Sequence, residues 1–134
     1  MVDFNEIWII NANGIALYHA NEKNKKSVNK NLISGFLSAF QSMLKASKQG
    51  DVEAIKFKDS KLNIIAFDDP VELYFIARTD QRERDRSVRK HLNRCGKQFI
   101  EMFKDEIVNW DGNIDAFEKF TDELGSYFDR IVCE

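Results

Sequence analysis

Cysteine, histidine, proline and glycine are all scarce in this chain of 134 residues, which holds two, two, one and six of them. Cys95 lies inside an apolar stripe with helical spacing, Cys133 lies next to the C-terminus, and neither histidine stands at metal-ligand spacing from a cysteine. We therefore expect no metal site, and we interpret both cysteines as reduced thiols of a cytosolic protein. Because proline and glycine are so few, no long flexible linker is indicated, and residues 1–134 are expected to form one domain.

Long apolar runs are missing as well. No stretch approaches the ~20 residues needed to span a bilayer, and the first residues, Met1–Glu6, lack the basic region and apolar run of a signal peptide. We therefore expect a cytoplasmic protein with no transmembrane segment. The net charge of −2 gives no overall attraction to nucleic acid. Aromatic residues are not interleaved with the densest cluster of cations, residues 82–94, so nucleic acid is not an expected partner.

Patterns that carry chemistry are also missing. The glycines are scattered, and no phosphate-binding loop, G-x-S-x-G nucleophile turn or H-E-x-x-H zinc motif occurs. We interpret His19 and His91 as surface histidines, and Asp68, Asp69 and Asp111 as turn residues. The sequence thus predicts no catalytic residue, no cofactor and no enzyme activity.

What the chain does have is a regular change of apolar periodicity, from strand-like to helical and back. The pattern predicts an element order of ββαβββαα. In chain order, the expected elements are strands Ile7–Asn11 and Ile15–His19, helix Leu32–Lys48, strands Val52–Lys58, Leu62–Phe67 and Val71–Arg78, and helices Arg82–Ile107 and Ile114–Val132.

This order predicts an α/β (α+β) fold with an antiparallel sheet of five strands. The first two strands form a hairpin, because Asn13-Gly14 between them is a strong turn signal. The first and fifth strands are apolar on both faces, so we expect them at the centre of a sheet covered by helices on both sides. The second and third strands are expected at the edges. The result is a three-layer α-β-α domain, with one helix on one face and two on the other.

The arrangement resembles the longin domain, a relative of the roadblock fold. The residues that carry the resemblance are the hairpin Ile7–His19, the helical run Leu32–Phe40, the strand Val71–Arg78 and the final helix introduced by Trp110-Asp111-Gly112. The roadblock fold begins with a helix, whereas the first strand here begins near residue 4, which favours the longin type. The resemblance rests on element order and covers nearly the whole chain.

The resemblance implies a protein-interaction module. Longin-like domains occur in vesicle SNAREs, adaptor small subunits, the signal-recognition-particle receptor, tethering complexes and exchange-factor complexes for small GTPases. Standalone versions are encoded in archaeal genomes related to eukaryotes. This chain has no heptad segment and no membrane anchor after the domain, unlike the SNARE type. The expected partners are therefore a small Ras-like GTPase or a trafficking subunit, together with a second longin or roadblock domain in a homo- or heterodimer.

The expected partner surface combines the first helix with the third strand. The apolar stripe of the helix Leu32–Lys48 is broad, so part of it is available as an interface. The third strand carries charge on both faces, which suits a sheet edge that can pair with another chain. The predicted partner-binding residues are Phe36, Phe40, Glu53, Ile55 and Phe57.

A second candidate surface is the densest charge cluster, which contains Arg82, Arg84, Arg86 and Arg89. One interpretation is a solvated helix face with alternating charge. The other is a docking site for an acidic partner or for phospholipid headgroups, which would give peripheral membrane contact. Cations near a helix start oppose the helix dipole by a few tenths of a kcal/mol each.

Another function class remains open beside the interaction module. Mixed α/β folds also host ligand pockets, and eleven phenylalanines are available to line one. The alternative is therefore a small-molecule sensor, which an internal cavity would distinguish from an interaction module.

Overall fold

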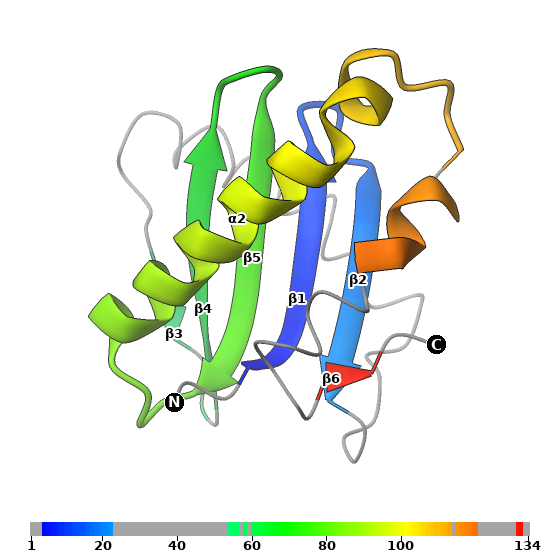
Figure 1. Cartoon of the computed structure of the whole chain (residues 1–134). Helices are drawn as coiled ribbons and strands as arrows, with labels where there is room; N and C mark the ends of the chain where they lie inside the picture. Colours follow the sequence, from blue (N-terminus) through cyan, green and yellow to red (C-terminus); the bar gives the residue numbers. More distant parts are fainter. Residues whose placement is uncertain are drawn as a thin grey trace.

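The computed structural model describes residues 4–22, 54–56, 58, 60–113, 115–120 and 131–132. These residues form an α+β fold in which an antiparallel sheet packs against a long helix (Figure 1). Its elements are β1 (Phe4–Asn11), β2 (Ala16–Glu22), β3 (Ala54–Lys56), β4 (Ser60–Phe67), β5 (Leu73–Asp80), α2 (Asp85–Val108), the 3-10 helix η1 (Asp115–Lys119) and β6 (Ile131–Val132).

The described strands follow the order β3-β4-β5-β1-β2-β6 across the sheet. The predicted central positions of the first and fifth strands are confirmed, and so is the edge position of the third. The prediction of five strands with the second at an edge is wrong, because β6 pairs with the outer side of β2. Residues Asn21 and Glu22 of β2 face Val132 and Ile131 across that ladder.

The last predicted helix, Ile114–Val132, is corrected at its two ends. Near its start lies the short 3-10 helix η1, its residues Ile131 and Val132 form β6, and residues 121–130 lie outside the described residues. Ile131 and Val132 are β-branched, and their backbone groups complete the ladder of β2 at an edge that would otherwise stay open. Tertiary pairing thus overrides the helical spacing of the local sequence.

The opening hairpin forms as predicted. Asn11 and Gly14 close its turn, since the Gly14 N–H donates to the Asn11 carbonyl at 3.0 Å and the Asn11 N–H donates to the Ile15 carbonyl at 3.0 Å. The Asn11 side-chain oxygen accepts the N–H groups of Asn13 and Ile15. Gly14 has a φ of 81°, a conformation that glycine adopts without steric cost. The Asn-Gly pair therefore sets the register of the two strands.

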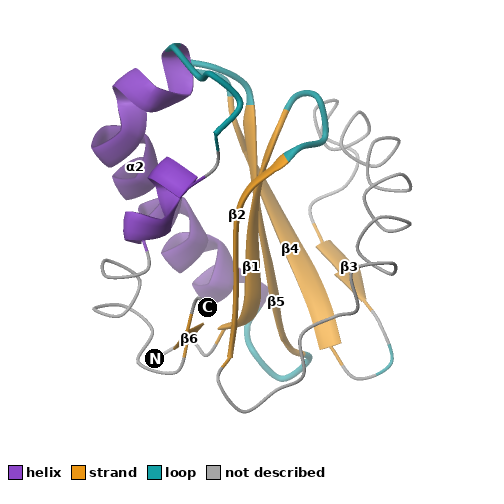
Figure 2. Cartoon of the chain, turned by 90° about the vertical axis from the view of Figure 1, so that its right-hand side faces the viewer, coloured by secondary structure: helices purple, strands orange, loops and turns teal. Residues whose placement is uncertain are grey.

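Helix α2 crosses one face of the sheet, as Figures 1 and 2 show. Its predicted apolar stripe is confirmed by burial. The prediction that it begins at Arg82 is wrong, because Arg84 occupies the N-cap position, and the Asp80 carboxylate accepts the Arg82 N–H within the preceding turn. The buried residues of α2 are Val88, Leu92, Cys95, Gly96, Phe99, Phe103 and Ile107.

Phenylalanine rings join α2 to the sheet and to η1. Phe99 is at the centre of this group, with its ring centroid 5.8 Å from that of Phe75 in β5 and 5.4 Å from that of Phe117 in η1. The Phe120 ring meets it edge-on at 5.0 Å. Such tilted and edge-to-face pairs contribute about 0.5–1.5 kcal/mol each beyond their burial.

The face of the sheet opposite α2 is buried too, as predicted for strands that are apolar on both sides. Trp8, Ile10, Ile64 and Ile76 alternate with the residues that face α2, and each is at most 4% exposed. The predicted helix Leu32–Lys48 lies outside the described residues, so the third layer stays a prediction.

Helix α2 packs tightly against the sheet at Gly96. A Cβ atom at this position would lie 2.8 Å from Cζ of Phe67 on β4 and closer still to its Cε2. Phe67 packs in turn against the Phe75 ring, with centroids 5.2 Å apart. Glycine is therefore needed here for space, although it is a poor helix former.

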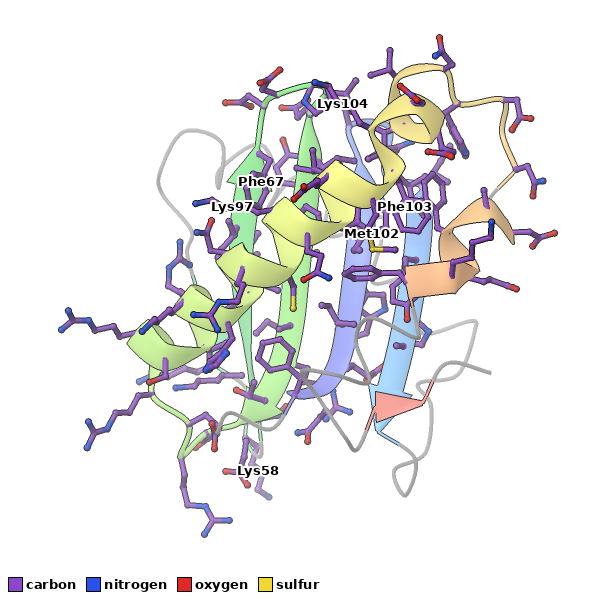
Figure 3. All side chains as sticks on the ribbon, in the orientation of Figure 1. Lys58, Phe67, Lys97, Met102, Phe103 and Lys104 are labelled. Atoms are coloured by element: carbon purple, nitrogen blue, oxygen red, sulfur yellow. The ribbon has the colours of Figure 1, made fainter. Side chains whose placement is uncertain are left out.

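We predict that Gly96→Ala destabilises the protein. Alanine gains up to about 1 kcal/mol in helix propensity, but overpacking against the Phe67 ring costs about 1–3 kcal/mol, so the free energy of unfolding falls. Urea denaturation measures the change. Lys97→Ala, at the neighbouring exposed position labelled in Figure 3, is the control and should change stability little. Phe67→Leu should relieve part of the cost of Gly96→Ala, and a Gly96→Ala protein more stable than the parent would contradict the packing argument.

Candidate interaction surfaces

The structure places only part of the predicted partner surface. Phe36, Phe40, Glu53 and Phe57 lie outside the described residues. Ile55 lies in the middle of β3, where it faces Leu62 of β4 across the antiparallel ladder. Because β3 occupies one end of the strand order, its other side borders no described strand.

The start of α2 is fixed to β4 by a buried lysine. Nζ of Lys61 donates to Oδ1 of Asp85 at 2.7 Å and also to the carbonyl of Glu83. Asn63 donates to the same Asp85 oxygen at 3.3 Å. The Lys61 hydrogen bond is the main reason why the pKa of Asp85 is lowered from its ordinary value. These contacts fix where the first turn of α2 lies, and with it the charged side chains that follow.

The four predicted arginines do not form one common surface. Arg82 and Arg84 lie in and directly after the turn that leads into α2, and the Arg82 side chain, 91% exposed, pairs with Asp80 at 3.3 Å. Arg86 is exposed in the first turn of the helix. Arg89 turns to the sheet, where it donates to the Ile64 carbonyl of β4 at 2.9 Å. Arg89 therefore helps to attach α2 to β4.

A different set of cations shares the outer side of α2. Arg86, Lys90, Arg94 and Lys97 follow one another at spacings of four, four and three residues, and all four are exposed. We call this set the basic ridge. The charge cluster recognised in the sequence continues to Lys90 and Arg94, but the predicted docking residues, Arg82, Arg84, Arg86 and Arg89, include only the first member of the ridge.

The half-buried side chain of His91 has a lowered pKa, in part because it lies near the cations of the ridge. Its pKa is lowered first by burial and then by the charges of Arg94 and Lys90. A cation beside an imidazole disfavours its protonated form.

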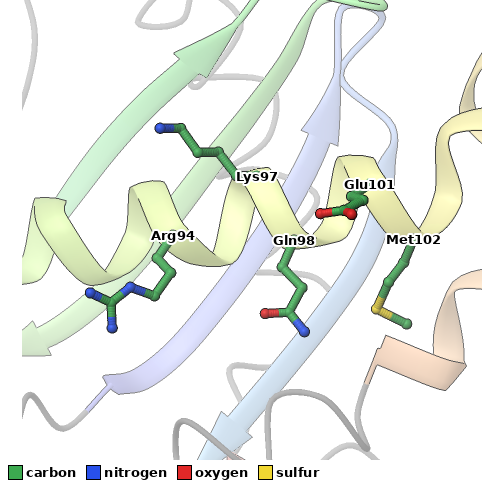
Figure 4. A pocket seen from close by; sticks show the side chains of 5 residues that line it. All are labelled: Arg94, Lys97, Gln98, Glu101 and Met102. Carbon is green, nitrogen blue, oxygen red and sulfur yellow. The ribbon is translucent and has the colours of Figure 1, made fainter.

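A hollow of about 450 Å³ lies along α2 next to the end of the ridge (Figure 4). Figure 4 shows Arg94 and Lys97 about one helical turn apart, with Gln98, Glu101 and Met102 farther along. Met102 is 38% exposed and is one of few large apolar side chains in that state among the described residues. The hollow thus brings two cations together with the Glu101 carboxylate and an apolar side chain.

The described sheet also contains a buried carboxylate. The side chain of Glu6 on β1 is 0% exposed and accepts from Arg78 Nε on β5 at 2.9 Å and from His19 Nε2 on β2 at 2.7 Å. The His19 ring stacks on Trp8, with centroids 5.4 Å apart. The interpretation of His19 as a surface histidine is therefore wrong, because it is half-buried and partners Glu6. This cluster joins three neighbouring strands and presents no carboxylate oxygen to solvent.

We predict that the two partners of the Glu6–Arg78 pair differ in the cost of their removal. Arg78→Leu leaves the buried carboxylate with His19 alone, so the free energy of unfolding should fall by about 3–5 kcal/mol. Glu6→Leu leaves two side chains that are 22% and 27% exposed and keep some water, so its cost should be smaller. Urea denaturation at neutral pH measures both, and equal costs would contradict the burial argument.

A smaller cleft, of about 190 Å³, lies between the hairpin turn, the start of β5 and the end of α2. Leu17, Val71, Ile107 and Trp110 supply its apolar lining. Its volume is below the roughly 300–1,000 Å³ usual for small-molecule sites. It gives the sensor alternative little support.

The described residues offer little support for a metal site, a reactive thiol or a membrane-spanning helix. No group of three or more His, Cys, Asp or Glu side chains among them can hold a metal ion. Cys95 is buried, and burial raises its pKa to about 12. No helix in the same part of the chain is both long enough and apolar enough to cross a bilayer.

No model of a known protein family matches the chain, and no curated protein matches its sequence.

Proposed function

We propose that this chain is a non-catalytic, longin-like interaction module that forms a dimer and binds a small Ras-like GTPase or a trafficking subunit in the cytoplasm. The observation that supports the proposal most is the strand order, with β1 and β5 at the centre and the short β3 at an edge. These are the positions expected from the apolar pattern for the first, fifth and third strands. In longin-like domains, which the chain resembles, the first helix and the third strand commonly pair with another copy.

The edge at β3 supports assembly for a physical reason. A strand at the end of a sheet offers backbone N–H and C=O groups on its outer side, and another chain can extend the sheet by pairing with them. Ala54 and Lys56 of β3 are both exposed. Neither side chain has the bulk or branching near the backbone that would hinder a second strand.

The chemistry of the buried groups supports a non-catalytic role. Glu6 has no solvent-exposed surface, and both of its recorded partners are side chains of neighbouring strands. The Cys95 thiol, with a pKa of about 12, stays protonated at neutral pH and is a poor nucleophile. These groups serve the packing of the sheet and helix.

A pull-down with small GTPases tests the partner. The immobilised chain is offered the Ras-like GTPases of its source cell, each loaded with GDP or with a non-hydrolysable GTP analogue. We expect at least one of them to be retained saturably in one or both nucleotide states. A lack of retention in either state across the whole set would contradict the GTPase part of the proposal.

Ile55→Glu tests the assembly surface separately. A charge in the middle of β3 should disfavour strand pairing with a second copy, so the mass in solution should fall from about twice to once 15.6 kDa. Size-exclusion chromatography with light scattering measures this. Lys58→Glu places the same side chain three residues away at an exposed position and is the control. An unchanged mass for Ile55→Glu, or a parent chain that is already monomeric, would contradict self-assembly through this edge.

A further inference from the structure

The distribution of charges along α2 destabilises the helix. Residues 82–97 contain seven lysines and arginines but only two carboxylates, in a chain whose net charge is −2. Asp85 is the only acidic residue of the first turn, and the last turn has no basic residue. Helix dipoles favour the opposite distribution, with carboxylates at the start and cations at the end.

The basic ridge adds a second unfavourable term. Arg86, Lys90 and Arg94 are four residues apart, so their like charges are neighbours on the helix surface. No ion pair relieves any of the four ridge cations among the described residues. A surface selected for stability alone would alternate the charges at these positions. The ridge is therefore better explained by something that it binds.

The geometry of the ridge suits an extended anionic ligand. The opposite side of α2 is buried on the sheet through Val88, Leu92 and Phe99. The ridge thus points away from the protein, and at 1.5 Å per residue it is about 16 Å long. The hollow beside Arg94, Lys97 and Met102 continues it. This length accommodates several carboxylates of one extended segment, at 3.3 to 3.6 Å per residue.

A protein segment fits this surface better than a membrane does. Exposed carboxylates follow the ridge on the same helix, at Glu101, Asp105 and Glu106. An anionic bilayer lying along α2 would meet them and be repelled. The exposed large apolar side chains of the described residues, among them Met102, lie outside the ridge, so the ridge itself offers no apolar residue for insertion between lipids. A narrow peptide can lie along the ridge and leave the helix before Glu101, which lines the hollow beside Arg94 and Lys97.

We infer that the basic ridge is the docking site for an acidic segment of a partner protein, whose carboxylates pair with Arg86, Lys90, Arg94 and Lys97. The arginines present planar forks that match carboxylate oxygens. The ridge lies on the helix layer rather than at β3, so this site does not depend on the proposed dimer or on a GTPase as partner.

Fluorescence anisotropy with a labelled, end-blocked hexaglutamate peptide tests the inference. We expect saturable binding at 50 mM salt that weakens at 200 mM salt, because the contacts are solvent-exposed. Lys90→Glu/Arg94→Glu should weaken binding at least tenfold. Lys104→Glu/Lys119→Glu makes the same change in net charge at exposed positions outside the ridge and should stay within twofold of the parent chain.

Stability measurements separate a loss of binding from a loss of folding. Lys90→Glu/Arg94→Glu turns the like-charge contacts with Arg86 and Lys97 into opposite-charge contacts and keeps one like-charge pair, between positions 90 and 94, so the Tm should not fall. Lys90→Gln/Arg94→Gln removes the two charges without reversing them and should weaken binding by an intermediate factor.

Three results would overturn the inference. The first is no peptide binding at 50 mM salt, and the second is an equal loss in the ridge variant and its charge-matched control. The third is binding to vesicles with 30% phosphatidylserine by a chain that does not bind the peptide, which would assign the ridge to a membrane surface.

Discussion

The fold depends on the neutralisation of one carboxylate. Glu6 sits in the central strand with no exposed surface, and an ionised carboxylate in that position costs several kcal/mol unless its charge is compensated. Arg78 and His19 supply the compensation from the strands on either side. This works only when β1 lies between β2 and β5 in one register, because a shift of one residue would move Glu6 to the face covered by α2. The buried charge therefore selects one sheet arrangement among those that apolar strands alone would allow.

The same logic applies on the other face, where α2 lies. Gly96 allows the helix to approach the Phe67 ring, while the ammonium group of Lys61 holds Asp85 and the Glu83 carbonyl at the helix start. One contact fixes the distance of α2 from the sheet and the other fixes its starting point. With both set, the directions of the side chains before the kink at Phe103 follow from the helical repeat. The basic ridge thus owes its outward position to contacts on the buried side of the helix.

Much of this arrangement could be predicted from local sequence, and what could not depends on distant partners. The Asn13-Gly14 hairpin and the stripe Val88, Leu92, Cys95, Phe99 and Phe103 are local patterns, and both were predicted correctly. The Glu6–Arg78 pair joins residues 72 positions apart, so no periodicity reveals it. The strand β6 was predicted as helix because its two residues have no periodicity of their own. For the candidate surfaces, sequence order grouped Arg89 with Arg86, whereas only the placement of β4 shows that Arg89 reaches the sheet.

Both faces of α2 carry residues that are unfavourable in a helix at their positions, but for different reasons. Gly96 is a poor helix former, but a close packing contact explains it. In the ridge, Arg86 is unfavourable in the first turn of a helix and the neighbouring cations repel one another, yet no ion pair among the described residues offsets these costs. Natural sequences agree across local and tertiary levels except where function requires otherwise. An unfavourable helix residue that a packing contact explains, such as Gly96, serves the fold. Unfavourable charges without such a contact indicate a ligand, and here they indicate one on the outer side of α2. This site lies away from the β3 edge, on which the longin resemblance alone would place the partner.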